Sequence, residues 1–160
     1  MGLFSFIKNA GAKVFGIGKT VEEESAEVLA AKQKAEAKAA AIMKETIIDL
    51  QLKVEDLDIH IEYDLATING VAHDQATKEK VVLIVGNSNG IASVDDQMEV
   101  NHEEPEALFY TVVKGDSLGK IAKTYYGNAM KYPEIFEANR PMLKNPDLIY
   151  PGQVLRIPKL

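Results

Sequence analysis

The chain has 160 residues, which is enough for one domain or for two small ones. It carries 18 basic and 24 acidic side chains, and the net charge of -6 argues against nucleic acid as the main partner. There is no cysteine, which excludes a disulfide scaffold, a thiol nucleophile and a cysteine-ligated metal centre. No run of about 18 apolar residues is present, so we expect no transmembrane segment.

The charge is unevenly distributed along the chain. Residues 1–107 contain 10 basic and 20 acidic side chains, whereas residues 108–160 contain 8 basic and 4 acidic ones, so the net charges are -10 and +4. This change predicts two units that attract each other. We expect an N-terminal helix at 1–19, a first domain at 20–100, a linker at 101–107 and a second domain at 108–160.

The first residues are apolar but do not form a credible targeting signal. No basic residue precedes the short apolar run, and no small-residue cleavage site closes it, which predicts a cytoplasmic protein. Residues 3–17 are interpreted as a short amphipathic helix that docks on the protein's own core or, as the alternative, on a membrane surface. Its apolar side consists of Leu3, Phe4, Ile7, Val14 and Phe15.

A long helix follows the N-terminal segment. Thr20 and Glu23 form a capping box, and the stretch to about residue 50 is rich in Ala, Glu and Lys and contains no Gly or Pro. The first half of this helix carries few large apolar groups. We therefore expect its second half to pack and its first half to be exposed.

Period-two alternation then predicts a β-hairpin. Apolar and polar residues alternate over 57–63, and a partner strand over 66–71 follows a short turn. A helix over 75–86, a loop at 86–90 and a strand over 91–100 complete the first domain.

The last 50 residues predict a different order of elements. A strand over 109–113 is followed by helices over 117–126 and 132–139 and by a closing strand over 153–157. Asp116 or Ser117 is expected to cap the first of these helices, since both are good N-cap residues.

This C-terminal segment closely resembles a LysM domain over residues 108–158. The residues that carry the resemblance are Tyr110, Thr111, Val112, Gly115, Asp116, Ser117, Leu118, Ile121, Ala122, Tyr126, Gly127, Ile135, Phe136, Asn139 and the run from Tyr150 to Pro158. LysM domains generally bind polymers that contain N-acetylglucosamine, such as peptidoglycan. The resemblance implies a glycan-type groove between two stretches, Gly115, Asp116, Ser117 and Leu118 on one side and Ile149, Tyr150 and Pro151 on the other.

Residues 36–100 resemble a BON domain. The hairpin end at 68–71 and the return at 90–96 carry this resemblance. With both parts, the chain resembles the family of small bacterial cytoplasmic potassium-binding proteins of BON–LysM architecture. That family implies an α+β fold in which a BON domain (αββαβ) precedes a LysM domain (βααβ), selective binding of K+ and a conformational change on binding.

The loop at 86–90 could support potassium binding. K+ is large and weakly hydrated, so it suits neutral carbonyl oxygens. Gly86 and Gly90 allow the backbone of the loop to turn several carbonyls inward. The resemblance assigns the ligands to the backbone carbonyls of Ile7, Ala10, Gly86, Ser88 and Ile91. The alternative is that the loop only connects a helix to a strand.

Other chemistry is weakly represented. No nucleophile–base pair or carboxylate pair stands out, so we do not expect an enzyme. The three histidines, His60, His73 and His102, have no metal-ligand spacing and are expected to be exposed. Asp95 and Asp96 could tune the field near the loop, or they are solvated turn residues.

The sequence therefore predicts a monomeric cytoplasmic potassium sensor. Its partners would be K+ and, within the chain, the contact between the two domains. The alternative is an envelope-stress protein that binds peptidoglycan through LysM and phospholipid through BON. Fractionation separates the two, because the sensor must be found in the cytoplasm.

Overall fold

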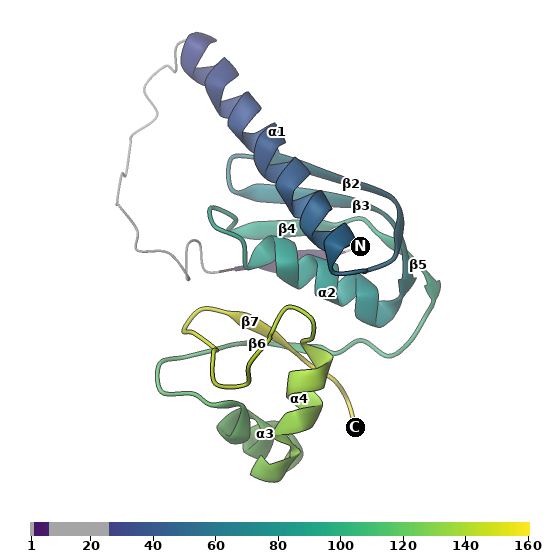
Figure 1. Ribbon diagram of the computed structural model, residues 1–160, viewed down its shortest axis with the longest axis vertical. Coiled ribbons are helices and arrows are strands. Elements are labelled where there is room, and N and C mark those ends of the chain that lie inside the picture. The colour runs from purple at the N-terminus through teal and green to yellow at the C-terminus, as the bar shows by residue number, and fades with distance from the viewer. Residues whose placement is uncertain (1, 7–25) are drawn as a thin grey trace.

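The computed structural model describes residues 2–6 and 26–160. The elements form two sheets, each with its own core, and Figure 1 shows the first group of elements, from β1 to β5, above the second. In chain order they are β1 (Gly2–Ser5), α1 (Ala26–Asp49), β2 (Val54–Glu62), β3 (Leu65–Asp74), α2 (Gln75–Gly86), β4 (Ser93–Asp96), β5 (Glu99–His102), β6 (Leu108–Thr111), α3 (Leu118–Tyr126), η1 (Ala129–Lys131), α4 (Tyr132–Ala138) and β7 (Val154–Ile157).

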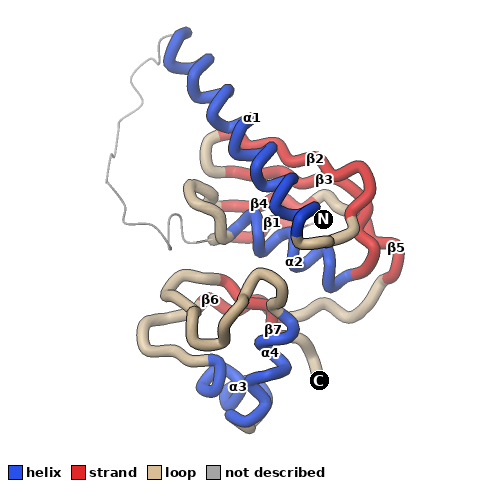
Figure 2. The backbone as a smooth tube through the Cα atoms, in the orientation of Figure 1, coloured by secondary structure: helices blue, strands red, loops and turns tan. Residues whose placement is uncertain are grey.

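The N-terminal domain is a sheet covered by two helices. The strand order is β1-β4-β3-β2, and β5 also pairs with β3. The β2–β3 and β1–β4 pairs are antiparallel, whereas β4 and β5 both run parallel to β3. Figure 2 shows α1 and α2 over the sheet, and no helix of the described residues is long and apolar enough to cross a membrane.

The core of this domain lies between the helices and the sheet. As predicted, the second half of α1 packs, and the buried residues of the helix, Ala40, Met43 and Ile47, all lie there. The first half extends beyond the sheet in Figure 1. The other buried apolar side chains are Ile59, Ile61, Ala66, Ile68, Val81, Val82, Val85, Ile91, Val94 and Met98.

The prediction of one continuous strand over 91–100 is wrong. The segment forms two short strands, β4 and β5, which pair with the first and second halves of β3. Between them the N–H of Met98 donates to Asp96 Oδ1 (3.0 Å), so the chain turns locally. A side chain that captures a nearby backbone N–H in this way competes with the strand ladder.

The N-terminal helix is also wrong where the structure describes it. Gly2–Ser5 is the strand β1, in which Phe4 lies opposite Val94. Phe4 and Phe6 pack against the core, whereas Leu3 is 71% exposed, so the apolar positions follow a period of two. The remaining residues of the expected apolar side, Ile7, Val14 and Phe15, lie outside the described residues, as does the capping box at Thr20.

The C-terminal domain has the predicted order of strand, helix, helix and strand. β6 and β7 are antiparallel, and α3 and α4 lie beside this two-stranded sheet. Ser117 is the N-cap of α3, because its Oγ accepts the N–H of Lys120 (3.2 Å), and Gly127 ends the helix in a left-handed conformation. The small core consists of Val112, Leu118, Ile121, Ala122, Ile135, Leu143, Leu155 and Ile157.

Candidate functional site

The loop that follows α2 is held by its own helix end. The N–H of Asn87 donates to the Leu83 carbonyl (2.9 Å) and the N–H of Ser88 to the Val85 carbonyl (3.1 Å). The Ser88 hydroxyl donates to the Ile84 carbonyl (2.6 Å). The serine side chain therefore fixes the loop, although sequence reasoning gave a role only to its backbone carbonyl.

Two of the expected carbonyl ligands are not engaged by the described part of the chain. The Ser88 carbonyl accepts the N–H of Ile91 in a long bond of 3.3 Å, whereas no donor among residues 2–6 and 26–160 is bonded to the carbonyls of Gly86 and Ile91. The loop from 86 to 91 contains no charged side chain. Neutral carbonyl oxygens without a carboxylate cage fit K+ better than they fit a small divalent cation.

The N-terminal strand reaches this loop through Phe6. Its N–H donates to the Ala92 carbonyl (2.7 Å), just beyond the loop. The Phe6 ring lies so close to Gly86 that a Cβ atom on residue 86 would collide with the ring. Gly86 is thus required by packing. The other two expected ligands, Ile7 and Ala10, lie outside the described residues, but Ile7 directly follows Phe6.

The aspartates of β4 do not form a solvated turn. Asp96 is 2% exposed, its carboxylate lies 3.5 Å from Lys78 Nζ, and burial raises its pKa despite that cation and the Met98 N–H. Asp95 accepts from Gln97 Nε2 (2.8 Å). Asp95 and Asp96 both belong to β4. The ion pair between Asp96 and Lys78 lies where β4 ends and not at the loop at 86–91.

Asn87 connects the loop directly to the C-terminal domain. Its Nδ2 donates to the Val154 carbonyl and its Oδ1 accepts the Val154 N–H, both at 2.9 Å. The side-chain amide thus makes the two hydrogen bonds to Val154 that one residue of a neighbouring strand would make. Sequence reasoning missed this role, because the two residues are separated by 67 positions and an Asn in a Gly-rich loop suggests only a turn.

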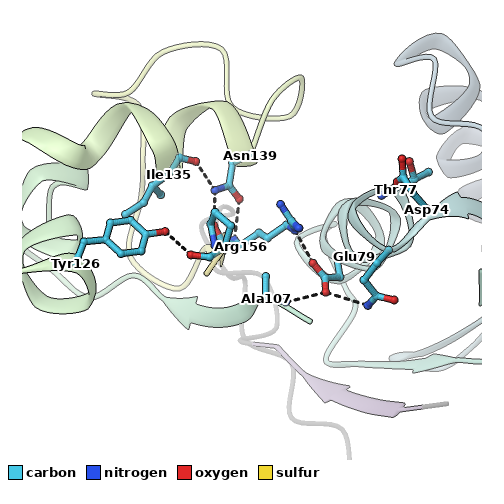
Figure 3. Close-up of polar contacts among 10 residues, drawn as sticks. Asp74, Thr77, Glu79, Ala107, Tyr126, Ile135, Asn139 and Arg156 are labelled. Carbon is cyan, nitrogen blue, oxygen red and sulfur yellow. Dashed lines mark hydrogen bonds and ion pairs between the residues drawn. The ribbon is translucent and has the colours of Figure 1, made fainter. Parts of the chain in front are cut away.

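A second contact is centred on Glu79 of α2, which is 5% exposed (Figure 3). Its Oε2 accepts from Arg156 Nε of β7, and its Oε1 accepts from Gln75 Nε2 (2.9 Å) and from the N–H of Ala107 (3.0 Å). Every bond to this carboxylate is charge-assisted, so the group is well compensated for its burial. One side chain thereby holds α2, the linker and β7 together.

The first side of the expected LysM groove is a rigid turn. Asp116 Oδ2 accepts the Tyr110 hydroxyl (2.7 Å) and the Val113 N–H (2.9 Å). These bonds lower the pKa of Asp116, and the bond to Asp116 raises the pKa of Tyr110 to about 12. Lys120 Nζ donates to the Gly115 carbonyl (2.8 Å), while Leu118 is buried in the core. These polar groups of the turn therefore form hydrogen bonds with one another and with neighbouring residues of the same domain.

The second side of that groove lies close to the N-terminal domain. Ile149 packs against the C-terminal core, and the N–H of Tyr150 donates to Gln153 Oε1 (3.2 Å), with exposed Pro151 beyond it. Tyr150 also lines a pocket of about 320 Å³ whose far wall includes Leu83, Ile84 and Asn87. A glycan bound at this side of the groove would lie in the pocket between Tyr150 and α2.

The chain is similar to known proteins both in its C-terminal part and along its whole length. The LysM domain family matches residues 110–158. The chain is 44% identical over 161 residues to the potassium binding protein Kbp of Escherichia coli O6:H1 (strain CFT073), and the match covers 99% of each chain. It is also 59% identical over 56 residues to an uncharacterised protein of Deinococcus radiodurans, a match that covers 35% of this chain and 21% of that protein. Since the first likeness extends over essentially the whole of both chains, the protein belongs to the family of the potassium binding protein Kbp.

Proposed function

We propose that this protein is a monomeric binder and sensor of K+ in the cytoplasm and that the loop at 86–91 holds the ion. The observation that carries the proposal is the pair of carbonyls, at Gly86 and Ile91, that no described donor occupies. The name of the Escherichia coli relative, which is similar along its whole length, supports the choice of ion.

The remaining ligands in this proposal come from the N-terminus. Phe6 is bonded to Ala92 and packs on Gly86, so the last described residue before Ile7 lies next to the loop. Ile7 and Ala10 are assigned as ligands on the family resemblance, and both follow Phe6 closely in the sequence. β1 then has a functional task, which is to deliver these carbonyls.

Sensing requires that the occupied loop changes another part of the molecule. Asn87 stands between two proposed ligands, Gly86 and Ser88, and its side chain is bonded to Val154. Fixing the backbone of the loop would therefore fix the orientation of this amide and favour docking of the C-terminal domain. The route is direct and does not pass through the linker at 101–107.

The decisive experiment is calorimetric titration with K+, Na+ and Mg2+ at constant ionic strength, together with thermal unfolding in matched KCl and NaCl. K+ at 100 times its dissociation constant should add about 2.7 kcal/mol to the free energy of unfolding, and Na+ much less. Equal melting curves in the two salts would contradict the proposal.

A glycine pair provides the matched variants for this experiment. Gly90 and Gly127 have φ of 87° and 70°, and within the described residues an added Cβ would meet no atom closer than 4 Å at either site. Gly90→Ala and Gly127→Ala therefore impose a similar backbone strain of roughly 1 kcal/mol. We expect only Gly90→Ala to weaken the response to K+.

A second candidate function is glycan binding by the C-terminal domain. The match to the LysM family over 110–158 favours it. Since Tyr150 faces α2 across the pocket, glycan binding and domain docking would compete. Titration with N-acetylglucosamine oligomers, with and without K+, would detect this competition.

A further inference from the structure

Two exposed histidines that are distant in sequence meet at the end of the sheet opposite the loop. His102 is the last residue of β5 and lies in register with Asp74, the residue that follows His73 in β3. The two imidazole ring centroids are 5.1 Å apart, with the ring planes at 55°. Asp74 caps the beginning of α2, so this pair is remote from the loop at the end of the same helix.

The hydrogen bond of His102 fixes which of its ring nitrogens is free. Nδ1 lies 2.9 Å from the backbone carbonyl of His73, and a carbonyl can only accept, so Nδ1 carries the proton that it donates. In the neutral ring, Nε2 then bears the lone pair. An Nδ1–H held by a carbonyl, with Nε2 available, is the usual state of a metal-ligating histidine.

The ring separation matches two ligands of one tetrahedral ion. A metal bound about 2.0–2.1 Å from one nitrogen of each ring lies about 3.2 Å from each centroid, which puts the centroids about 5.2 Å apart. The backbone of His73 is itself anchored, since its N–H donates to the Lys53 carbonyl (3.0 Å). The backbone that carries the His73 ring is therefore held in place.

Charges of both signs lie near the two histidines. Asp74 follows His73 and lies in register with His102, so its carboxyl group belongs to the same end of the sheet. Lys80 also acts on Asp74 electrostatically and is the opposing charge in this neighbourhood. Within the described residues, no cluster of three or more His, Cys, Asp or Glu could hold a metal, so water would complete the coordination.

We propose that His73 and His102 form a two-histidine site for a borderline divalent transition metal such as Zn2+, Ni2+ or Cu2+, separate from the K+ loop. Imidazole nitrogen is a preferred ligand of these ions, whereas K+ binds oxygen. The bound ion would join the end of β5, where the linker begins, to β3.

The test is a calorimetric titration of the untagged full chain with Zn2+ alone. Saturation at one ion per chain is expected, with Cu2+ bound more tightly than Zn2+. His73→Asn and His102→Asn should each reduce the affinity at least about tenfold, since even groups outside the ligand shell cost that much. His60→Asn removes the exposed histidine of β2 and should leave the affinity unchanged.

A measurement on the wild-type protein does not depend on how the variants fold. In imidazole 1H–15N spectra, Zn2+ should shift the signals of His73 and His102 and leave those of His60 in place. Binding without saturation, equal loss in all three variants, or equal shifts at all three rings would overturn the proposal. None of these readouts involves K+, so the proposal stands or fails independently of the potassium site.

Discussion

Asp116 shows how one side chain stabilises the turn before α3. The hydrogen bonds of Val113 and Tyr110 favour its charged form and lower its pKa. A carboxyl with a depressed folded-state pKa adds stability above its usual value of 3.8, and this stability is lost as the pH falls through the folded-state pKa. The contribution is modest, on the order of 1 kcal/mol, because the group is partly exposed.

Asp116→Ala should therefore lower the free energy of unfolding at neutral pH, and the deficit should shrink as the pH falls below the range in which Asp116 ionises. Denaturant unfolding of both proteins at neutral and acidic pH measures this. Asp147→Ala serves as the control, because Asp147 is exposed in the same domain. A deficit that is independent of pH would show that the carboxylate charge is not the cause.

Sequence reasoning identified residues whose partners are near in the chain. The sequence predicts Asp116 or Ser117 as the cap of α3, and the cap is Ser117, whose partner Lys120 is three residues away. Asn87 and Glu79 were not identified, because their partners in β7 are 67 and 77 positions away. A local pattern cannot contain a contact that only the packing of two domains creates.

β1 is the element on which the proposed site most depends. Phe6→Ala would empty the space over Gly86 and release the end of the strand from the loop. Because the side chain is only partly buried, we expect a loss of roughly 1–3 kcal/mol in the free energy of unfolding. Faster amide exchange in β4, the partner of β1, and weaker K+ binding should accompany it.

Leu3→Ala is the matched variant in the same strand. Leu3 is 71% exposed, so its truncation should change stability by no more than about 0.5 kcal/mol and leave K+ binding intact. Equal effects of the two variants would mean that β1 acts only through its backbone pairing.

At this scale the sequence predicted long elements better than short ones. The hairpin has a clear period of two, the segment of α1 contains no Gly or Pro, and the second domain resembles a known family along its length. β1 and β4 have four residues each, too few to separate a period of 2 from one of 3.6. The break between β4 and β5 depends on the Asp96–Met98 bond, which no periodicity reveals.

At the scale of the whole molecule, side-chain contacts within the described residues join the two domains. Asn87 is bonded to Val154, Glu79 to Arg156, and the ring centroids of Phe4 and Phe109 are 5.2 Å apart. The net charges of -10 and +4 favour the same arrangement. Of these contacts, the pair of hydrogen bonds between the Asn87 side chain and Val154 is the one that involves the proposed K+ loop itself.

Asn87→Ala should therefore separate K+ binding from compaction. The variant keeps the backbone carbonyls of the loop but loses both bonds to Val154, so K+ should still bind, more weakly, while compaction is lost. Small-angle scattering in KCl and in NaCl of the same ionic strength measures this, and the wild-type chain should be more compact in KCl.

An ion pair provides the second arm of the same experiment. Glu79→Gln removes the charge that faces Arg156 between the domains, whereas Glu137→Gln removes the charge of an exposed pair with Arg140 inside the C-terminal domain. Only the first should increase the radius of gyration, because losing one partner of a buried pair leaves the other uncompensated, at a cost of about 3–5 kcal/mol. If Asn87→Ala and Glu79→Gln both retain the wild-type difference between the two salts, these contacts do not transmit the occupancy of the loop. In that case the protein would bind K+ without coupling it to domain docking.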